Sequence, residues 1–183
     1  MPFNCKLFRK ERSSGFTLLE LLVVIAIIGL FSSIVMVSLG SVRRDSRNTY
    51  RNQSMEEYIK AANLYYATYG EYPPTSTSSE PLYCLAKDTP NCYFFGGNKP
   101  TDNTLNNAFS EYIKVSGPFP LIDNASFASI PIEGPFYQCS FVNGLCMGVF
   151  FLWYLDGDKN CGNGAQGVYS EFFNVTTCPL TLE

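Results

Sequence analysis

Histidine is absent from this chain of 183 residues. Without it, the sequence cannot encode a Ser-His-Asp triad, a Cys-His dyad or a zinc site with histidine ligands. The cysteines include no Cys-x-x-Cys pair, which is the usual spacing in a cysteine zinc site. These absences argue against an enzyme, and we expect no catalytic residues.

Positive charge is scarce in most of the chain. Eight of the thirteen Lys and Arg residues lie between Lys6 and Arg51, and only five lysines follow, against thirteen acidic residues. The region 52–183 therefore carries a net charge of about −8, which repels a phosphate backbone. We expect no direct binding of nucleic acid by this region.

Proline is missing between Phe16 and Tyr72, so a single helix can extend through this whole stretch. Its first part, 16–40, is almost wholly apolar. About 24 helical residues measure roughly 36 Å, which exceeds the bilayer's hydrocarbon core of about 30 Å. The sequence therefore predicts a transmembrane helix over 16–40, preceded by a short basic segment, 1–15.

Glu20 is the only acidic residue in this apolar segment. A carboxylate in a membrane-spanning helix costs about 2.5 to 3.5 kcal/mol at the bilayer centre and is functional by default. In one interpretation its side chain reaches the membrane surface from the first turn. In the other, cleavage after Gly15 creates a new amine at Phe16, four residues away on the same helical face, and Glu20 neutralises it.

Two rival interpretations of the amino-terminal region stay open. A secretory signal would be cut at Ser38-Leu39-Gly40 to leave a mature chain from Ser41. Its apolar core, however, would exceed the usual length of about 7 to 15 residues and would contain an acid. A plain, uncleaved membrane anchor is the other interpretation.

The stretch 41–70 is polar overall but keeps helical spacing, which predicts an amphipathic second half of the helix. Its apolar stripe is expected to pack on a globular head, and its other faces carry charged residues, among them Arg51. Gly70, followed by Pro73, predicts the end of the helix. The stripe consists of Met55, Tyr58, Ile59, Ala62, Tyr65, Tyr66 and Tyr69.

The remaining residues, 71–183, are predicted to form the head. The segment 75–134 is rich in Ser, Thr, Asn, Pro and Gly and favours loops, with a short helix around 105–115. Aromatic and β-branched runs, with an Asn143-Gly144 turn after the first, predict three antiparallel strands. The runs cover 136–142, 146–155 and 167–175.

Seven cysteines are present, and the odd one, Cys5, lies in 1–15. Removal of that segment leaves an even number, which is typical of disulfides formed in an oxidising compartment outside the inner membrane. Several connectivities are open, and we predict neighbour pairing. A tight turn at 143–144 would place Cys139 diagonal to Cys146, so their bridge needs an irregular hairpin. The predicted pairs are Cys84–Cys92, Cys139–Cys146 and Cys161–Cys178.

The sequence resembles the type IV pilin superfamily, which includes the pseudopilins of type II secretion. The resemblance rests on a basic leader ending in Gly15, then Phe16, then Glu20 in an unbroken apolar helix, as in the class III signal peptide of a prepilin. A second match is the helix end, Tyr-x-x-x-x-Gly-x-Tyr-Pro, formed by Tyr65, Gly70, Tyr72 and Pro73.

The resemblance implies an α+β type IV pilin fold, in which a long N-terminal helix packs on a small antiparallel sheet. It also implies that a prepilin peptidase removes the leader, 1–15, between Gly15 and Phe16. The new amine of Phe16 would then be methylated to N-methylphenylalanine. Glu20 of a neighbouring subunit would neutralise this amine during assembly.

For function, the resemblance implies a structural subunit that polymerises through its N-terminal helix into a filament for adhesion, motility or DNA uptake. Its expected partners are other pilin subunits, the prepilin peptidase and an inner-membrane assembly machinery. The precursor would lie in the inner membrane with its head outside, and the mature subunit in a surface or extracellular filament. A pseudopilus of a secretion or competence system, and a membrane-anchored binding domain that never polymerises, are the alternatives.

One segment of the head, 156–162, offers oxygen ligands at alternate positions, as calcium-binding loops do. Compared with an EF-hand loop, its glycine comes one place late and Gly167 stands where the last ligand should be. An ordinary Asp-Gly turn also explains the segment. Because some secretion pseudopilins bind calcium in this region, calcium is kept as the one cofactor hypothesis, with the ligands Asp156, Asp158 and Asn160.

Overall fold

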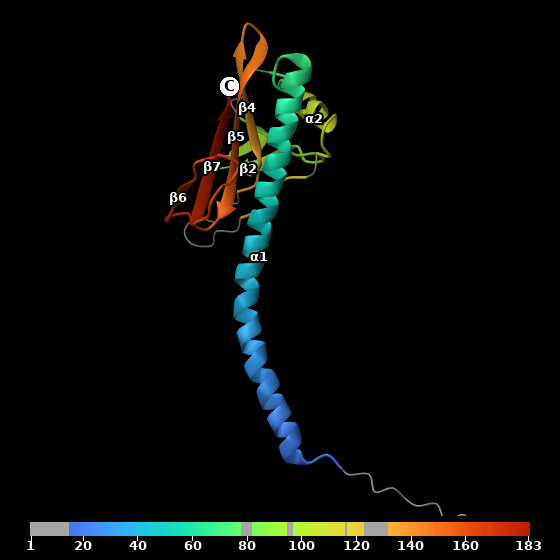
Figure 1. Ribbon diagram of the computed structural model, residues 1–183, viewed down its shortest axis with the longest axis vertical. Coiled ribbons are helices and arrows are strands. Elements are labelled where there is room, and N and C mark those ends of the chain that lie inside the picture. The colour runs from blue at the N-terminus through green and yellow to red at the C-terminus, as the bar shows by residue number, and fades with distance from the viewer. Residues whose placement is uncertain (1–14, 78–81, 95–96, 116, 123–131) are drawn as a thin grey trace, which may run out of the picture. The chain divides into compact units, whose positions relative to one another are not determined.

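The computed structural model describes residues 15–77, 82–94, 97–115, 117–122 and 132–183, except for the side chains of 34–38 (Figure 1). The predicted leader lies outside the described residues, apart from Gly15. The chain divides into two compact units, 1–42 and 43–183, and each is considered by itself.

The first helix, α1, covers Leu18–Tyr69 without a break and belongs to both units. It ends at Gly70, whose φ of 77° is a left-handed conformation that glycine adopts without strain. The Gly70 amide donates to the Tyr66 carbonyl at 2.8 Å and closes the last turn. The single helix predicted over 16–70 is confirmed, with a start two residues later than expected.

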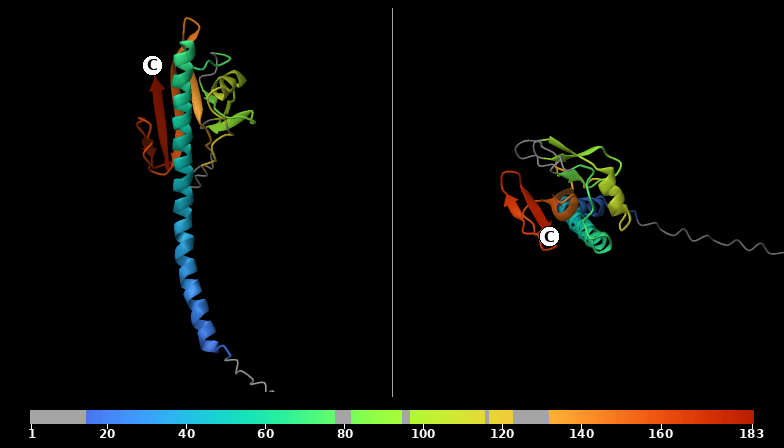
Figure 2. Two further views of the ribbon diagram at one scale, coloured as in Figure 1. Left: turned by 45° about the vertical axis from the view of Figure 1, so that its right-hand side comes forward. Right: turned by 90° about the horizontal axis from the view of Figure 1, so that it is seen from above.

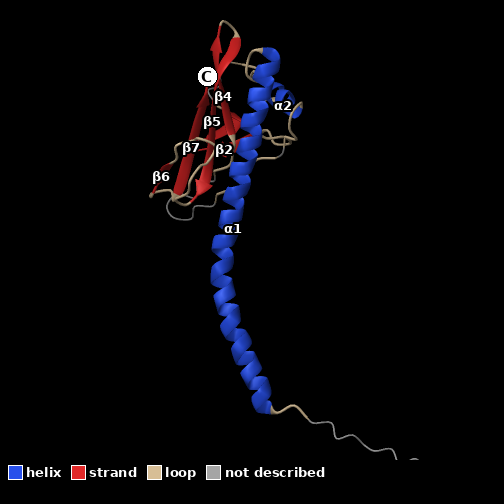
Figure 3. Cartoon of the chain, in the orientation of Figure 1, coloured by secondary structure: helices blue, strands red, loops and turns tan. Residues whose placement is uncertain are grey.

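The second unit contains a five-stranded antiparallel sheet in the order β1-β4-β5-β7-β6 (Figure 3). Its longest hairpin joins β4 and β5 through Asn143 and Gly144, whose φ values of 53° and 85° fit the type I′ turn expected from the sequence. The strands are Tyr83–Cys84 (β1), Phe136–Val142 (β4), Leu145–Asp156 (β5), Val168–Ser170 (β6) and Val175–Leu182 (β7).

A two-stranded sheet and a short helix complete the second unit. β2 (Asn91–Phe94) and β3 (Gly97–Pro100) form an antiparallel hairpin, and α2 (Asn103–Ser110) follows it. The buried Asp102 carboxylate accepts hydrogen bonds from two amides of the first turn of α2, at 2.7 and 3.1 Å. This cap sets the start of α2.

The strand β5 is buried on both faces. Phe151 and Trp153 belong to the main core, which includes the second half of α1, whereas Leu152 and Tyr154 belong to a second core that includes residues of β2. The sheet of the head therefore lies between α1 and the β2–β3 hairpin (Figure 2). The residues that α1 contributes to the main core are Met55, Tyr58, Ala61 and Ala62.

The predicted elements of the head need three corrections. The helix expected over 105–115 begins at Asn103, because Asp102 caps it, and ends at Ser110. The segment 75–134, expected to be mostly loops, also contains β1, β2 and β3. The run 167–175 is not one strand, since only Val168–Ser170 pair before a turn.

The strand β7 was missed because a proline lies within it, and proline removes a donor from a strand ladder. Pro179 stands opposite Leu152 of β5. On its other side β7 pairs with β6 only from Val175 to Thr177. The described residues therefore place Pro179 at a free edge, where the missing amide breaks no ladder.

The predicted fold class is confirmed. A long N-terminal helix and a five-stranded antiparallel sheet form an α+β architecture that matches the type IV pilin fold. Within this fold the two ends of α1 differ. Its first half belongs to the unit that contains Gly15, Phe16 and Glu20, and its second half carries the head.

Candidate processing and assembly site

The peptide bond between Gly15 and Phe16 lies just before α1, in a segment without regular secondary structure. Both residues are exposed, and 73% of the Phe16 surface is accessible. A bond in this position can enter the cleft of a peptidase without unwinding the helix. The local structure is therefore compatible with the predicted cleavage point.

Thr17 and Glu20 form a capping box at the start of α1. Glu20 Oε2 accepts hydrogen bonds from the Thr17 amide at 2.9 Å and from the Thr17 hydroxyl at 2.8 Å. In return, the Glu20 amide donates to Thr17 Oγ1 at 3.2 Å. These bonds satisfy amides that the start of a helix leaves unpaired. Both residues would stay in the chain after cleavage at Gly15.

The capping box was not among the features predicted for Glu20, for which only the charge was considered. The signal was present, because Thr-x-x-Glu before an apolar run is the usual pattern of this cap. Of the two carboxylate oxygens of Glu20, only Oε2 accepts a hydrogen bond from the described residues. The other oxygen keeps its acceptor capacity, so Glu20 can hold its own helix start and still accept a bond from a cationic amine.

The first half of α1 exposes apolar side chains on every face. A helix with this pattern normally lies in a larger apolar environment. A transmembrane helix was predicted over 16–40. Among the described residues, no helix is both long enough and apolar enough to cross a membrane. The exposed residues are Leu18, Leu19, Leu21, Leu22, Val23, Val24, Ile25, Ile27, Ile28, Leu30 and Phe31.

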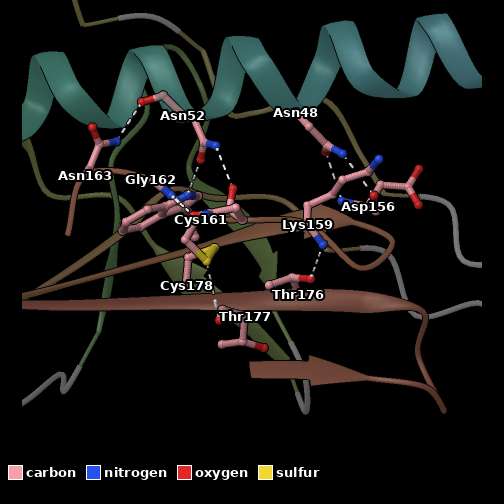
Figure 4. Close-up of a disulfide and its surroundings, with 12 residues drawn as sticks. Asn48, Asn52, Asp156, Lys159, Cys161, Gly162, Asn163, Thr176, Thr177 and Cys178 are labelled. Atoms are coloured by element: carbon pink, nitrogen blue, oxygen red, sulfur yellow. Dashed lines mark hydrogen bonds between the residues drawn. A yellow bond between two sulfur atoms is a disulfide. The ribbon is translucent and has the colours of Figure 1, made fainter. Parts of the chain in front are cut away.

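In the second unit, an asparagine of α1 binds the end of β5 (Figure 4). Asn48 Nδ2 donates to the Asp156 carbonyl at 2.9 Å, and Asn48 Oδ1 accepts from the Asp156 amide at 2.9 Å. The carboxamide thus pairs with the strand backbone as a neighbouring peptide group would. These two hydrogen bonds connect residues that are 108 positions apart in the sequence.

One turn further along α1, Asn52 binds both the sheet and the loop after it (Figure 4). Its Oδ1 accepts from Trp153 Nε1 at 2.9 Å, and its Nδ2 donates to the Asn160 carbonyl at 3.2 Å. The Asn52 backbone carbonyl accepts from Asn163 Nδ2 at 3.0 Å. The loop 157–163 is therefore held directly on the helix.

The six cysteines of the head pair as predicted. The Cα atoms of each pair lie 5.6 to 5.8 Å apart, which suits a disulfide. The hairpin irregularity that Cys139–Cys146 requires is a β-bulge between Ser140 and Phe141. The bridge Cys161–Cys178 joins the loop on α1 to β7 (Figure 4).

Arg51 needs a correction, because the helical pattern placed it away from the apolar stripe and yet it is only 1% exposed. Its guanidinium donates to Asn48 Oδ1 at 3.0 Å and to the Pro120 carbonyl at 2.6 Å. Burial, and then the nearby Arg47, lower the pKa of Arg51 to about 10, while Asp156 acts in the opposite direction. Oxygen acceptors supplied by the tertiary structure make this burial possible.

Of the three side chains proposed as calcium ligands, that of Asn160 is already engaged in a hydrogen bond. Asn160 Oδ1 already accepts from the Gly162 amide at 2.9 Å, and the carbonyls of Asp156, Gly157 and Asn160 accept bonds from α1 and β7. Calcium requires about six to eight oxygens. The described residues contain no group of three or more His, Cys, Asp or Glu side chains that could hold a metal ion. Calcium binding stays a prediction.

Comparison with known proteins identifies the amino-terminal segment. The prokaryotic N-terminal methylation motif matches residues 11–36. This motif is the class III signal peptide of type IV pilins and pseudopilins, which confirms the resemblance noted at Gly15, Phe16 and Glu20. No curated protein matches the chain, and neither does any solved structure.

Proposed function

We propose that this chain is a prepilin, the precursor of a structural subunit that polymerises through α1 into a type IV pilus-like filament. The observation that carries the proposal is the methylation motif over 11–36. Its processing point coincides with an exposed, non-helical bond before a helix that is apolar on every face. A prepilin peptidase would cut between Gly15 and Phe16, and the Phe16 amine would then be methylated.

Assembly follows from the chemistry of the first half of α1. Once the assembly machinery takes this helix out of the membrane, its apolar surface would meet water, and burying that surface against copies of the helix contributes about 25 cal/mol for each Å². The Phe16 amine would enter the same apolar bundle, where an unpaired charge is costly. Glu20 of a neighbouring subunit supplies the counter-charge, and this pairing sets the stagger between subunits.

The head is proposed to lie outside the inner membrane, both in the precursor and in the filament. Three disulfides in one small unit support an oxidising compartment. The apolar segment would hold the precursor in the inner membrane until the assembly machinery extracts it. The role of the chain is mechanical, and we propose no reaction for it.

A pseudopilus of a type II secretion or competence system is the second candidate, because the same motif occurs in pseudopilins. The two candidates share processing and helix packing and differ in filament length. A third possibility, a tether that never polymerises, would keep its leader or stay in the membrane.

The decisive experiment is intact-mass and N-terminal analysis of the chain recovered from sheared surface material and from membranes. The pilus proposal expects a chain that begins with methylated Phe16 in the sheared fraction. A processed, methylated chain that is confined to the cell envelope would favour the pseudopilus. A chain that begins at Met1 and occurs only in membranes would overturn both and leave the tether.

A further inference from the structure

A cavity of about 1150 Å³ opens on the side of the head that carries α2. Its walls come from 86–90, just before β2, and from the stretch 101–115, which includes α2, together with Gly117. This volume slightly exceeds the usual range for small-ligand sites, about 300 to 1,000 Å³. None of the lining residues belongs to α1. The proposed assembly through α1 therefore does not explain this cavity.

The cavity wall contains three carboxamides of α2. Asn103 and Asn107 lie one turn apart, are exposed, and form no side-chain hydrogen bond within the described part of the chain. Each carboxamide offers two N–H donors and an acceptor oxygen. Two neighbouring groups of this kind can pair with adjacent hydroxyls of one ligand, since a hydroxyl is also both donor and acceptor.

The third carboxamide, Asn106, has an incomplete set of hydrogen bonds. Its side chain is largely buried, with 9% exposed, and its Nδ2 donates to the Ala86 carbonyl at 2.8 Å. Its Oδ1 is buried and is the one side-chain atom of this kind without a partner among the described residues. Because buried polar atoms are nearly always paired, this oxygen calls for a donor such as a bound water behind the cavity wall, since a ligand in the cavity cannot reach it.

The charges around the cavity favour a neutral ligand. Two lysines, Lys87 and Lys114, are balanced by Asp88 and Glu111, and Glu111 already accepts a hydrogen bond from Tyr69 at 3.0 Å. Without an excess of either sign, the site has no means of selecting an anion or a cation. A peptide is less suitable, because peptide recognition uses apolar anchor pockets or a strand edge, whereas this wall is mostly polar.

We propose that this α2 cavity binds a neutral carbohydrate, whose hydroxyl groups pair with the exposed carboxamides of Asn103 and Asn107. Tyr112 also lines the cavity, and its side chain is fixed by a hydrogen bond from its hydroxyl to Thr68 Oγ1 at 3.1 Å and by ring packing against Tyr65. The site would give the head a binding activity that does not depend on whether the chain polymerises.

The test uses the purified full chain in a zwitterionic detergent without a sugar headgroup, since alkyl glycosides would compete for the cavity. Saturation-transfer NMR and calorimetry are run against a panel of neutral oligosaccharides of hexoses and N-acetylhexosamines. An acidic galacturonate oligomer and an uncharged Gly-Ser peptide form the comparison arms. We expect at least one neutral oligosaccharide to bind and neither comparison probe to do so.

The variants Asn103→Ala and Asn107→Ala remove exposed side chains, so the head should remain folded. Each is expected to weaken binding of the neutral oligosaccharide about two- to tenfold, the effect of one lost hydrogen bond. Asn98→Ala, an exposed asparagine of β3 that does not line the cavity, should bind as the unsubstituted chain does. Failure of the whole neutral panel, preference for the acidic oligomer or the peptide, or unchanged binding by both α2 variants would overturn the proposal.

Discussion

At the start of α1, the Glu20 side chain provides a helix cap and a negative charge at the same time. The cap works through Thr17, whose amide and hydroxyl both donate to Oε2. The charge matters for assembly only if a neighbouring amine needs neutralising. Glutamine replaces glutamate in a capping box but carries no charge, so substitution can separate the two contributions.

We expect Glu20→Gln to be processed normally but to lower the amount of filament in sheared material about tenfold or more, because an unpaired amine in an apolar bundle is costly. Glu20→Ala should behave in the same way. Thr17→Ala breaks the cap but keeps the charge and should still assemble. The measurement is immunoblotting of sheared and cell fractions, with mass spectrometry to verify cleavage.

The matched control for this series is Glu57→Ala, which removes an exposed acid elsewhere on α1. It should assemble as the unsubstituted chain does. Filaments of normal abundance from Glu20→Gln would refute the charge pairing and would leave the helix cap as the function of Glu20.

Arg51 is the residue whose burial differs most from what the helical pattern of 41–70 predicts. The effect of this burial on the free energy of unfolding can be measured. Arg51→Ala removes the donors to Asn48 and Pro120 and leaves a cavity, so we expect the free energy of unfolding to fall by about 2 to 4 kcal/mol. The exposed Arg47→Ala should change it by no more than about 0.5 kcal/mol. Urea unfolding of the full chain in detergent distinguishes the two, and equal effects would contradict the burial of Arg51.

Among the elements, α1 was predictable and the sheet was only partly so. The helix follows from local properties, namely an unbroken run without proline and a glycine at its end. The hairpin of β4 and β5 was also visible, because Asn143-Gly144 encodes its own turn. β7 could not be predicted in this way. A strand accepts a proline such as Pro179 only where no neighbouring strand needs its amide, and this depends on how far β6 extends along β7.

The contact of α1 with β5 can be tested through Trp153, the only tryptophan in the chain. Asn52→Ala removes the acceptor of the indole N–H of the fully buried Trp153, and also the hydrogen bond to the Asn160 carbonyl. We expect a loss of about 1 to 3 kcal/mol in the free energy of unfolding and a shift in the tryptophan emission maximum. The exposed Asn63→Ala should change neither. Unchanged emission from Asn52→Ala would exclude this indole hydrogen bond.

For the molecule as a whole, buried tyrosines lower the stability at alkaline pH, while the lowered pKa of Arg51 acts in the opposite direction. Burial raises the pKa of Tyr137 well above its ordinary value of 10, and its hydroxyl donates to the Pro73 carbonyl at 2.6 Å. Burial also raises the pKa of Tyr154. Both phenols stay protonated in the folded chain at a pH where the unfolded chain ionises them. Their contribution to stability is complete below about pH 10 and is lost as the pH rises further.

We expect the free energy of unfolding to fall above about pH 10, by up to about 1.4 kcal/mol per pH unit for each such tyrosine. Urea unfolding at pH 8, 10 and 11 measures the slope, and absorbance at 295 nm follows ionisation of the phenols. Tyr154→Phe should make the slope shallower. Tyr93→Phe, at an exposed tyrosine, should leave the slope unchanged, and equal slopes for all three chains would contradict the burial of Tyr154.

The methylation motif, the long helix and the even number of cysteines in the head could all be recognised from the sequence. Each of these is a local or additive property: a short motif, an apolar run without proline, and an even number of cysteines beyond the leader. The burial of Arg51, the pairing of β7 and the cavity beside α2 became visible only in the folded chain. These features depend on contacts between distant residues, such as Asn48 and Asp156, and hydrophobic periodicity within one segment carries no information about them.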